Sequence, residues 1–163
     1  MKKLVVGLGN PILGDDGVGW VVAEEVKTIL LSLPSLSCDS PGEESSVDVD
    51  CLSLGGISLM ERLIGYDRAI LVDAFVCEEE VGEIVVSELD ELPDLSAFHL
   101  TSVHDLSLQN AMKLGRQMGA RLPDEVVVVG ISARHIYDFS EELSPPVREA
   151  VPKATQIVAK LLA

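Results

Sequence analysis

The chain has 163 residues, of which 47% are hydrophobic and only 4% aromatic, and its 12 basic and 27 acidic residues give a formal charge of -15. This length and composition predict a single globular domain, residues 1–163, with an aliphatic core. Nucleic acid and anionic membranes are disfavoured as partners, because both carry the same sign of charge as the chain. Metal ions and basic peptides are compatible with it.

The cysteines and the amino-terminal segment indicate where the protein works. Cys38, Cys51 and Cys77 have no CxxC spacing and give no sign of a disulfide framework. The apolar run after Lys3 stops at Gly7, too early for a signal peptide. No stretch approaches the roughly 20 apolar residues of a membrane span. We therefore expect a cytoplasmic protein without membrane insertion.

Hydrophobic periodicity predicts strands that alternate with helices. The first half of the chain is predicted to contain a strand at 4–9, a helix from 17 to the proline at 34, a strand at 47–52, a short helix at 58–64 and a strand at 69–75. The first helix carries a long apolar stripe, which predicts one packed face. Its members are Val18, Val21, Val22, Val26, Ile29, Leu30 and Leu33.

The second half completes the pattern. A strand predicted at 81–89 follows the previous strand too closely for a parallel crossover, so it should be antiparallel. A helix is expected from 101 to 119 with Ser102 as its N-cap, then a strand at 126–131 buried on both faces, and a last helix at 147–162. The fold class is therefore α/β: a doubly wound, three-layer α/β/α sandwich whose five-stranded sheet is mostly parallel with one antiparallel strand.

The loop from Gly7 to Gly17, with the sequence GLGNPILGDDG, follows the first strand. A glycine loop in this place is typical of nucleotide phosphate sites, but the third glycine of the dinucleotide pattern is Ile12 and no Gly-Lys-Ser/Thr follows. Asp15 and Asp16 would also repel a phosphate. We therefore expect that the loop binds no nucleotide. A structural alternative to a ligand role, which applies to Asp15 in particular, is that this residue is the N-cap of the following helix.

Three residues converge on one edge of the predicted sheet. Asp16 ends the first loop, Asp73 ends a buried strand, and His104 lies in the first turn of the helix expected from 101. Ligands of doubly wound folds sit beyond the carboxyl ends of the strands. Two oxygens and one imidazole nitrogen suit nickel or zinc. Taken singly, each residue also has an ordinary structural explanation, and an aspartic dyad of Asp16 and Asp73 is a second catalytic arrangement.

With these residues in place, the chain resembles the [NiFe]-hydrogenase maturation endopeptidases. The resemblance rests on the motif Gly7–Gly19, on Leu71-Val72-Asp73-Ala74, on Ser102-Val103-His104 and on the closing segment Phe139–Val147. It implies an endopeptidase that cuts a C-terminal extension from the precursor of the hydrogenase large subunit after nickel insertion. It also implies that Asp16, Asp73 and His104 contact this nickel, which the precursor presents.

Two departures from the family pattern stand out. Where many members have Asp-Gly-Gly-Thr-x-Gly after the second strand, this chain has CLSLGG, residues 51–56, so only the last glycine clearly matches. Position 16 is Glu in some members and Asp here, which moves the carboxylate by on the order of 1.5 Å. An alternative function is a non-catalytic checkpoint module that binds the nickel-loaded precursor without cutting it.

Overall fold

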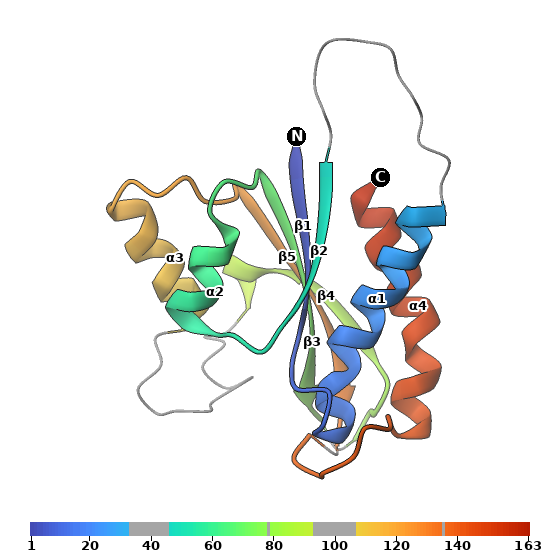
Figure 1. The fold of residues 1–163 in the computed structure, drawn as a ribbon. Helices are drawn as coiled ribbons and strands as arrows, with labels where there is room; N and C mark the ends of the chain where they lie inside the picture. The colour runs from blue at the N-terminus through green and yellow to red at the C-terminus, as the bar shows by residue number, and fades with distance from the viewer. Residues whose placement is uncertain (33–45, 78, 93–106, 135) are drawn as a thin grey trace.

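The computed structural model describes residues 1–32, 46–77, 79–92, 107–134 and 136–163. These form a layered α/β structure in which a central sheet is flanked by helices on both faces (Figure 1). The strands are β1 (Lys2–Leu8), β2 (Ser46–Leu52), β3 (Arg68–Val76), β4 (Ile84–Glu88) and β5 (Glu125–Ala133). The α-helices are α1 (Val18–Ser32), α2 (Gly56–Leu63), α3 (Leu108–Gln117) and α4 (Pro145–Leu162), and two short 3-10 helices are η1 (Gly14–Gly17) and η2 (Leu89–Glu91).

The sheet has the strand order β2-β1-β3-β5-β4. The first four strands of this order run parallel, and β4 pairs with β5 in the antiparallel sense. This confirms the predicted fold class, including its one antiparallel strand. The carboxyl ends of β1, β2, β3 and β5 share one edge of the sheet, and the loop that carries Asp15 and Asp16 leaves β1 at this edge.

Each face of the sheet has its own aliphatic core, because successive residues of a strand point to opposite sides. Val5 and Ile70 face α1 and α4, whose inner sides supply Val22 and Val151 among others. Leu4, Val6 and Leu71 instead pack in the core that includes residues of α2 and α3. The run at 126–129 is buried, as its four consecutive valines predict. No helix in the described ranges is long and apolar enough to cross a membrane.

The apolar stripe predicted for α1 is wider than the face that this helix buries. Val18, Val22 and Val26 are buried as expected. Val21 and Ile29 are not, since they are 38% and 40% exposed. The prediction was wrong for these two residues because the sheet and α4 cover a narrower strip of the helix than its hydrophobic periodicity suggests.

The start of α3 also differs from the prediction. The helix begins at Leu108, and its N-cap is Ser107, whose hydroxyl accepts a hydrogen bond from the backbone N–H of Asn110 at 3.3 Å. Ser102 and His104, which the prediction placed at the cap and in the first turn, come before this start in the sequence and lie outside the described residues. Both serines could cap a helix locally, and the later one does so.

Candidate functional site

Asp16 lies in η1, at the carboxyl-end edge of the sheet, and is only 5% exposed. Its Oδ2 accepts a hydrogen bond from the backbone N–H of Asn10 at 2.7 Å. Asn10 in turn shapes the loop, because its Oδ1 accepts a hydrogen bond from the N–H of Ile12 at 3.2 Å. The carboxylate is thus held by the glycine-rich loop itself, which satisfies part of its need for donors away from water.

Close backbone packing fixes the position of this loop. Gly9 has a φ of +119°, and a Cβ there would overlap the carbonyl oxygen of Asp16. Gly19 lies so close to the sheet that a Cβ would overlap the carbonyl oxygens of Leu8 and Val72. The glycines therefore allow the first turn of α1 to sit directly on β1 and β3. Their function here is close approach between backbones.

Asp73 belongs to β3, where it pairs in register with Gly130 of β5 and precedes the last three residues of the strand. It was predicted to end the strand, but β3 continues to Val76. Asp73 is 8% exposed, and its Oδ1 accepts a hydrogen bond from the N–H of Ala74 at 2.8 Å. Asp73 follows Val72, the residue against which Gly19 packs. Contacts between η1 and β3 complete the arrangement, so both buried aspartates belong to the same corner of the fold.

Asp15 does not cap its own helix, contrary to the simplest interpretation of the sequence. The N-cap residue of η1 is Leu13, which makes no side-chain capping bond. The carboxylate of Asp15 is fully buried and accepts two hydrogen bonds from Ser144, the N-cap residue of α4. Asp15 therefore has an architectural role, whereas its neighbour Asp16 remains a candidate ligand.

The segment before α4 packs along the same loop. Leu13 and Ser140 form a parallel bridge, in which Gly14 N donates to Ser140 O at 2.7 Å and Ser140 N donates to Ile12 O at 3.1 Å. Sequence reasoning noticed the family likeness of this segment but missed its contacts with the first loop. No local pattern could reveal them, because the two partners lie more than 120 residues apart.

His104 lies outside the described residues, so the three-residue site is described only for its two aspartates. Within the described ranges, no group of three or more His, Cys, Asp or Glu residues could hold a metal ion. The oxygen chemistry of Asp16 and Asp73 fits a divalent metal such as nickel, which accepts carboxylate and imidazole ligands. A third ligand from elsewhere would be needed to complete the predicted set.

The end of β2 borders the candidate site. The carbonyl oxygen of Leu52 accepts hydrogen bonds from Gly9 N and from Trp20 Nε1, each at 3.2 Å. Ser53 Oγ donates to the carbonyl oxygen of Gly9 at 2.6 Å. The segment that departs from the family pattern is therefore attached directly to the loop of Asp16. Leu54, 43% exposed, follows on the same loop.

Comparisons with known proteins agree with this architecture. The family model for hydrogenase maturation proteases matches residues 46–161. A protein of Methanocaldococcus jannaschii with the provisional name of hydrogenase maturation protease is 30% identical over 165 residues, covering 97% of this chain and 96% of the relative. A solved hydrogenase 2 maturation peptidase from Thaumarchaeota archaeon SCGC_AB-539-E09 is 29% identical, with a TM-score of 0.65 and coverage of 99% and 98%.

The hydrogenase maturating endopeptidase HybD of E. coli has the same fold, with a TM-score of 0.74 at 24% sequence identity. The match covers 99% of this chain and 92% of that one. The protein is therefore an endopeptidase, and thus a hydrolase, whose doubly wound sheet carries buried carboxylates at its carboxyl-end edge. The chain belongs to the hydrogenase maturation protease family.

Proposed function

We propose that this protease removes the C-terminal extension from the precursor of a [NiFe]-hydrogenase large subunit, and that it does so only after nickel has been inserted. The observation that carries the proposal is the pair of buried aspartates, Asp16 in η1 and Asp73 in β3, on elements that touch at the carboxyl-end edge of the sheet. Buried carboxylates are costly unless hydrogen bonds, charges or metal ions compensate them. A metal-loaded substrate would supply such a charge.

In this proposal the nickel arrives with the precursor and is part of the substrate. Asp16 and Asp73 would supply oxygen ligands, and His104 a nitrogen ligand, as the family resemblance implies. A divalent metal in such a place can polarise a carbonyl group or activate a water molecule. The chain itself holds the carboxylates in position through the N–H groups of Asn10 and Ala74. Fixed ligands of this kind can discriminate a loaded from an unloaded precursor.

The charge of the protein supports the same partner. A formal charge of -15 favours a basic or metal-loaded tail and disfavours nucleic acid. Its three cysteines, without a disulfide framework, fit action in the cytoplasm.

The deciding experiment is intact-mass spectrometry of a large-subunit precursor after incubation with this protein, with and without nickel loading. Loss of a C-terminal peptide from the loaded precursor alone is expected. Cleavage of both forms would remove the nickel checkpoint from the proposal. Binding of the loaded precursor without any cleavage would instead identify a non-catalytic checkpoint module.

A variant at position 104 tests the third ligand. We expect His104→Ala to fold normally and to lose processing of the nickel-loaded precursor, because the metal would lack its nitrogen ligand. Circular dichroism and the melting temperature check the fold. A well-folded variant with full activity would remove His104 from the site while leaving the protease function intact.

A further inference from the structure

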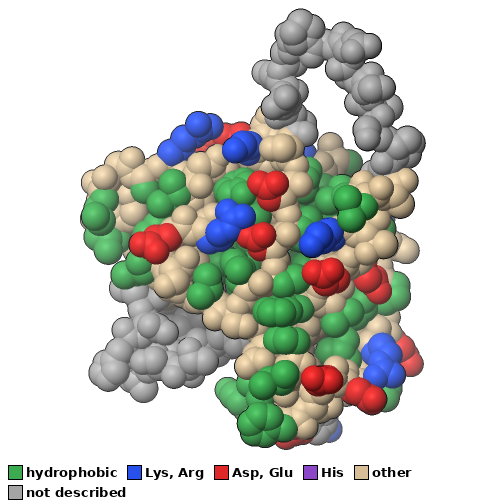
Figure 2. Space-filling model, viewed as in Figure 1, with side chains coloured by type: hydrophobic (Ala, Val, Ile, Leu, Met, Phe, Trp, Pro, Cys, Tyr) green, Lys and Arg blue, Asp and Glu red, His purple; other side chains and the backbone are tan. Residues whose placement is uncertain are grey.

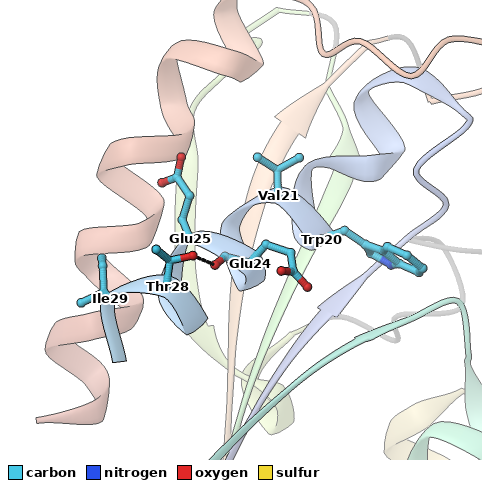
Figure 3. Close-up of a pocket in the computed structure, with 6 residues that line it drawn as sticks. All are labelled: Trp20, Val21, Glu24, Glu25, Thr28 and Ile29. Atoms are coloured by element: carbon cyan, nitrogen blue, oxygen red, sulfur yellow. Dashed lines mark hydrogen bonds between the residues drawn. The ribbon is translucent and has the colours of Figure 1, made fainter. Parts of the chain in front are cut away.

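The outer face of α1 carries a hollow of about 550 Å³, outside the carboxylate site. It is lined by Trp20, Val21, Glu24, Glu25, Thr28 and Ile29 (Figure 3). From Trp20 to Ile29 the helix rises by about 14 Å, the length of about four residues of extended peptide. In the space-filling view, acidic, basic and hydrophobic side chains lie interspersed on the side of the molecule where Figure 1 has α1 and α4 (Figure 2). We call these six residues the α1 groove.

Two of the lining residues are apolar side chains that the fold leaves uncovered. Val21 and Ile29 continue the hydrophobic stripe of α1, yet they are 38% and 40% exposed. Grouped exposed apolar side chains with a polar border are typical of interaction surfaces, whereas single exposed ones are ordinary. Val21 and Ile29 line one open hollow together with the exposed side chain of Glu24, which distinguishes them from scattered single side chains.

The α1 groove is rigidly connected to the candidate site. Trp20 at one end of the groove donates its Nε1–H to the carbonyl oxygen of Leu52, which also accepts the N–H of Gly9. Asp16 stands one turn before Trp20, in the short helix that leads into α1. At the other side of the helix, Glu25 reaches toward α4 and accepts a hydrogen bond from the hydroxyl of Thr155 at 2.9 Å (Figure 3). A chain segment in this groove would therefore lie at a fixed distance from Asp16.

We propose that the α1 groove is an exosite that binds a cationic segment of the hydrogenase precursor, with a Lys or Arg beside aliphatic side chains. Val21 and Ile29 would receive the aliphatic part, and the exposed carboxylate of Glu24 the cation. A second copy of this chain is a poor occupant, because two surfaces of charge -15 repel each other and the groove carries two glutamates of its own. This inference rests on the proposed function for the identity of the partner.

The test compares the affinity of the nickel-loaded, full-length precursor for the wild-type protein and for a double variant, Val21→Gln with Ile29→Gln. Glutamine forms helices well, so the fold should be retained. We expect the double variant to bind about tenfold more weakly, because the polar amides cannot replace the apolar contacts that Val21 and Ile29 would make with the segment. The matched control is Leu114→Gln, because Leu114 is also 40% exposed but lies on α3, against the other face of the sheet. This control should bind like the wild type.

A second variant isolates the charge. Glu24→Gln should weaken binding about threefold at low salt and reduce the dependence of affinity on ionic strength. Its control is Glu61→Gln on α2, which also has an exposed side chain. Cleavage at saturating precursor should stay at the wild-type rate in all groove variants, because Asp16 and Asp73 are unchanged. The groove variants should therefore raise KM and leave kcat unchanged.

The outcomes separate the two proposals. Wild-type affinity in the double variant overturns the exosite and leaves the protease function standing. Binding that depends on the groove, without cleavage by the wild type, supports the exosite and overturns the protease function. A dimer of the free protein in sedimentation that the double variant abolishes would assign the groove to a second copy and overturn the exosite.

Discussion

Asp15 and Ser144 are joined by two hydrogen bonds across 129 positions of the chain: the N–H of Ser144 donates to Oδ1 of Asp15 at 2.6 Å, and its hydroxyl donates to Oδ2 at 2.8 Å. One fully buried carboxylate thus connects the first loop to the start of α4. The next residue, Asp16, belongs to the candidate site. We therefore expect the two adjacent aspartates to have different functions, which variants can separate.

Removal of the Asp15 carboxylate should be strongly destabilising. Asp15→Ala leaves two donors of Ser144 without their acceptor, and we expect a loss of about 3 kcal/mol in the free energy of unfolding. Ser144→Ala removes only the hydroxyl bond and should cost about 1 kcal/mol. Urea unfolding with a fixed m-value measures both. Equal stability of Asp15→Ala and the wild type would show that this contact does not hold the loop.

Asp16→Asn should show the opposite pattern. The amide keeps the size of the carboxylate and an oxygen that can accept the N–H of Asn10, so the melting temperature should stay close to that of the wild type. Processing of the nickel-loaded precursor should be lost, because the amide lacks the charge that favours a cation. Intact-mass spectrometry measures the product. Collapse of the fold in Asp16→Asn would assign it a structural role like that of Asp15.

The sheet could be predicted from sequence because its signals are local. The four valines at 126–129 predict a strand buried on both faces, and the short connection after Phe75 predicts an antiparallel partner and not a parallel crossover. The position of Asp16 at the carboxyl-end edge also followed, since parallel strands fix where their loops emerge. These inferences need no knowledge of distant contacts.

The features that were missed depend on distant or competing partners. Nothing near Asp15 in the sequence indicates Ser144, so a local N-cap was the natural but wrong interpretation. Ser102 and Ser107 are both residues that can cap a helix, and residue type alone does not predict that α3 starts after Ser107. Val21 obeys the periodicity of α1, but the width of the buried face depends on how α4 and the sheet cover the helix. The placement of Asp16 and Asp73 toward one edge of the sheet could be predicted, while the hydrogen bonds that hold their carboxylates could not. Their role as ligands of one metal stays a prediction.

Gly19 tests whether close backbone packing positions the candidate site. A Cβ there would overlap the carbonyl oxygens of Leu8 and Val72, so Gly19→Ala must push α1 away from β1 and β3. We expect a loss on the order of 2–3 kcal/mol in unfolding free energy, and slower processing because η1 carries Asp16. Gly55→Ala is the control, since a Cβ there meets no atom within 4 Å. It should cost about 1 kcal/mol or less. Equal effects of the two changes would contradict this role of Gly19.

Cys51 should react slowly with alkylating reagents. Burial, and then the nearby carboxylate of Glu24, raise the pKa of this thiol to about 11. The Sγ–H donates weakly to Glu24 Oε1 at 3.6 Å and to the carbonyl oxygen of Trp20 at 3.8 Å. Because the thiolate is the nucleophile, iodoacetamide at pH 8 should label Cys51 more slowly than an unstructured thiol. A variant with Cys38 and Cys77 replaced by serine leaves a single site, whose labelling mass spectrometry can follow.

The same shift makes the stability of the fold depend on pH in a defined window. The folded state favours the protonated thiol, so between the ordinary pKa of 9.0 and about 11 it binds more protons than the unfolded chain. The contribution of Cys51 is therefore complete below pH 9 and is lost as the pH rises through about 11. Cys51→Ala should flatten this alkaline decline in urea unfolding, and Glu24→Gln should speed the labelling of Cys51 at pH 9. An unchanged labelling rate in Glu24→Gln would mean that burial alone protects the thiol.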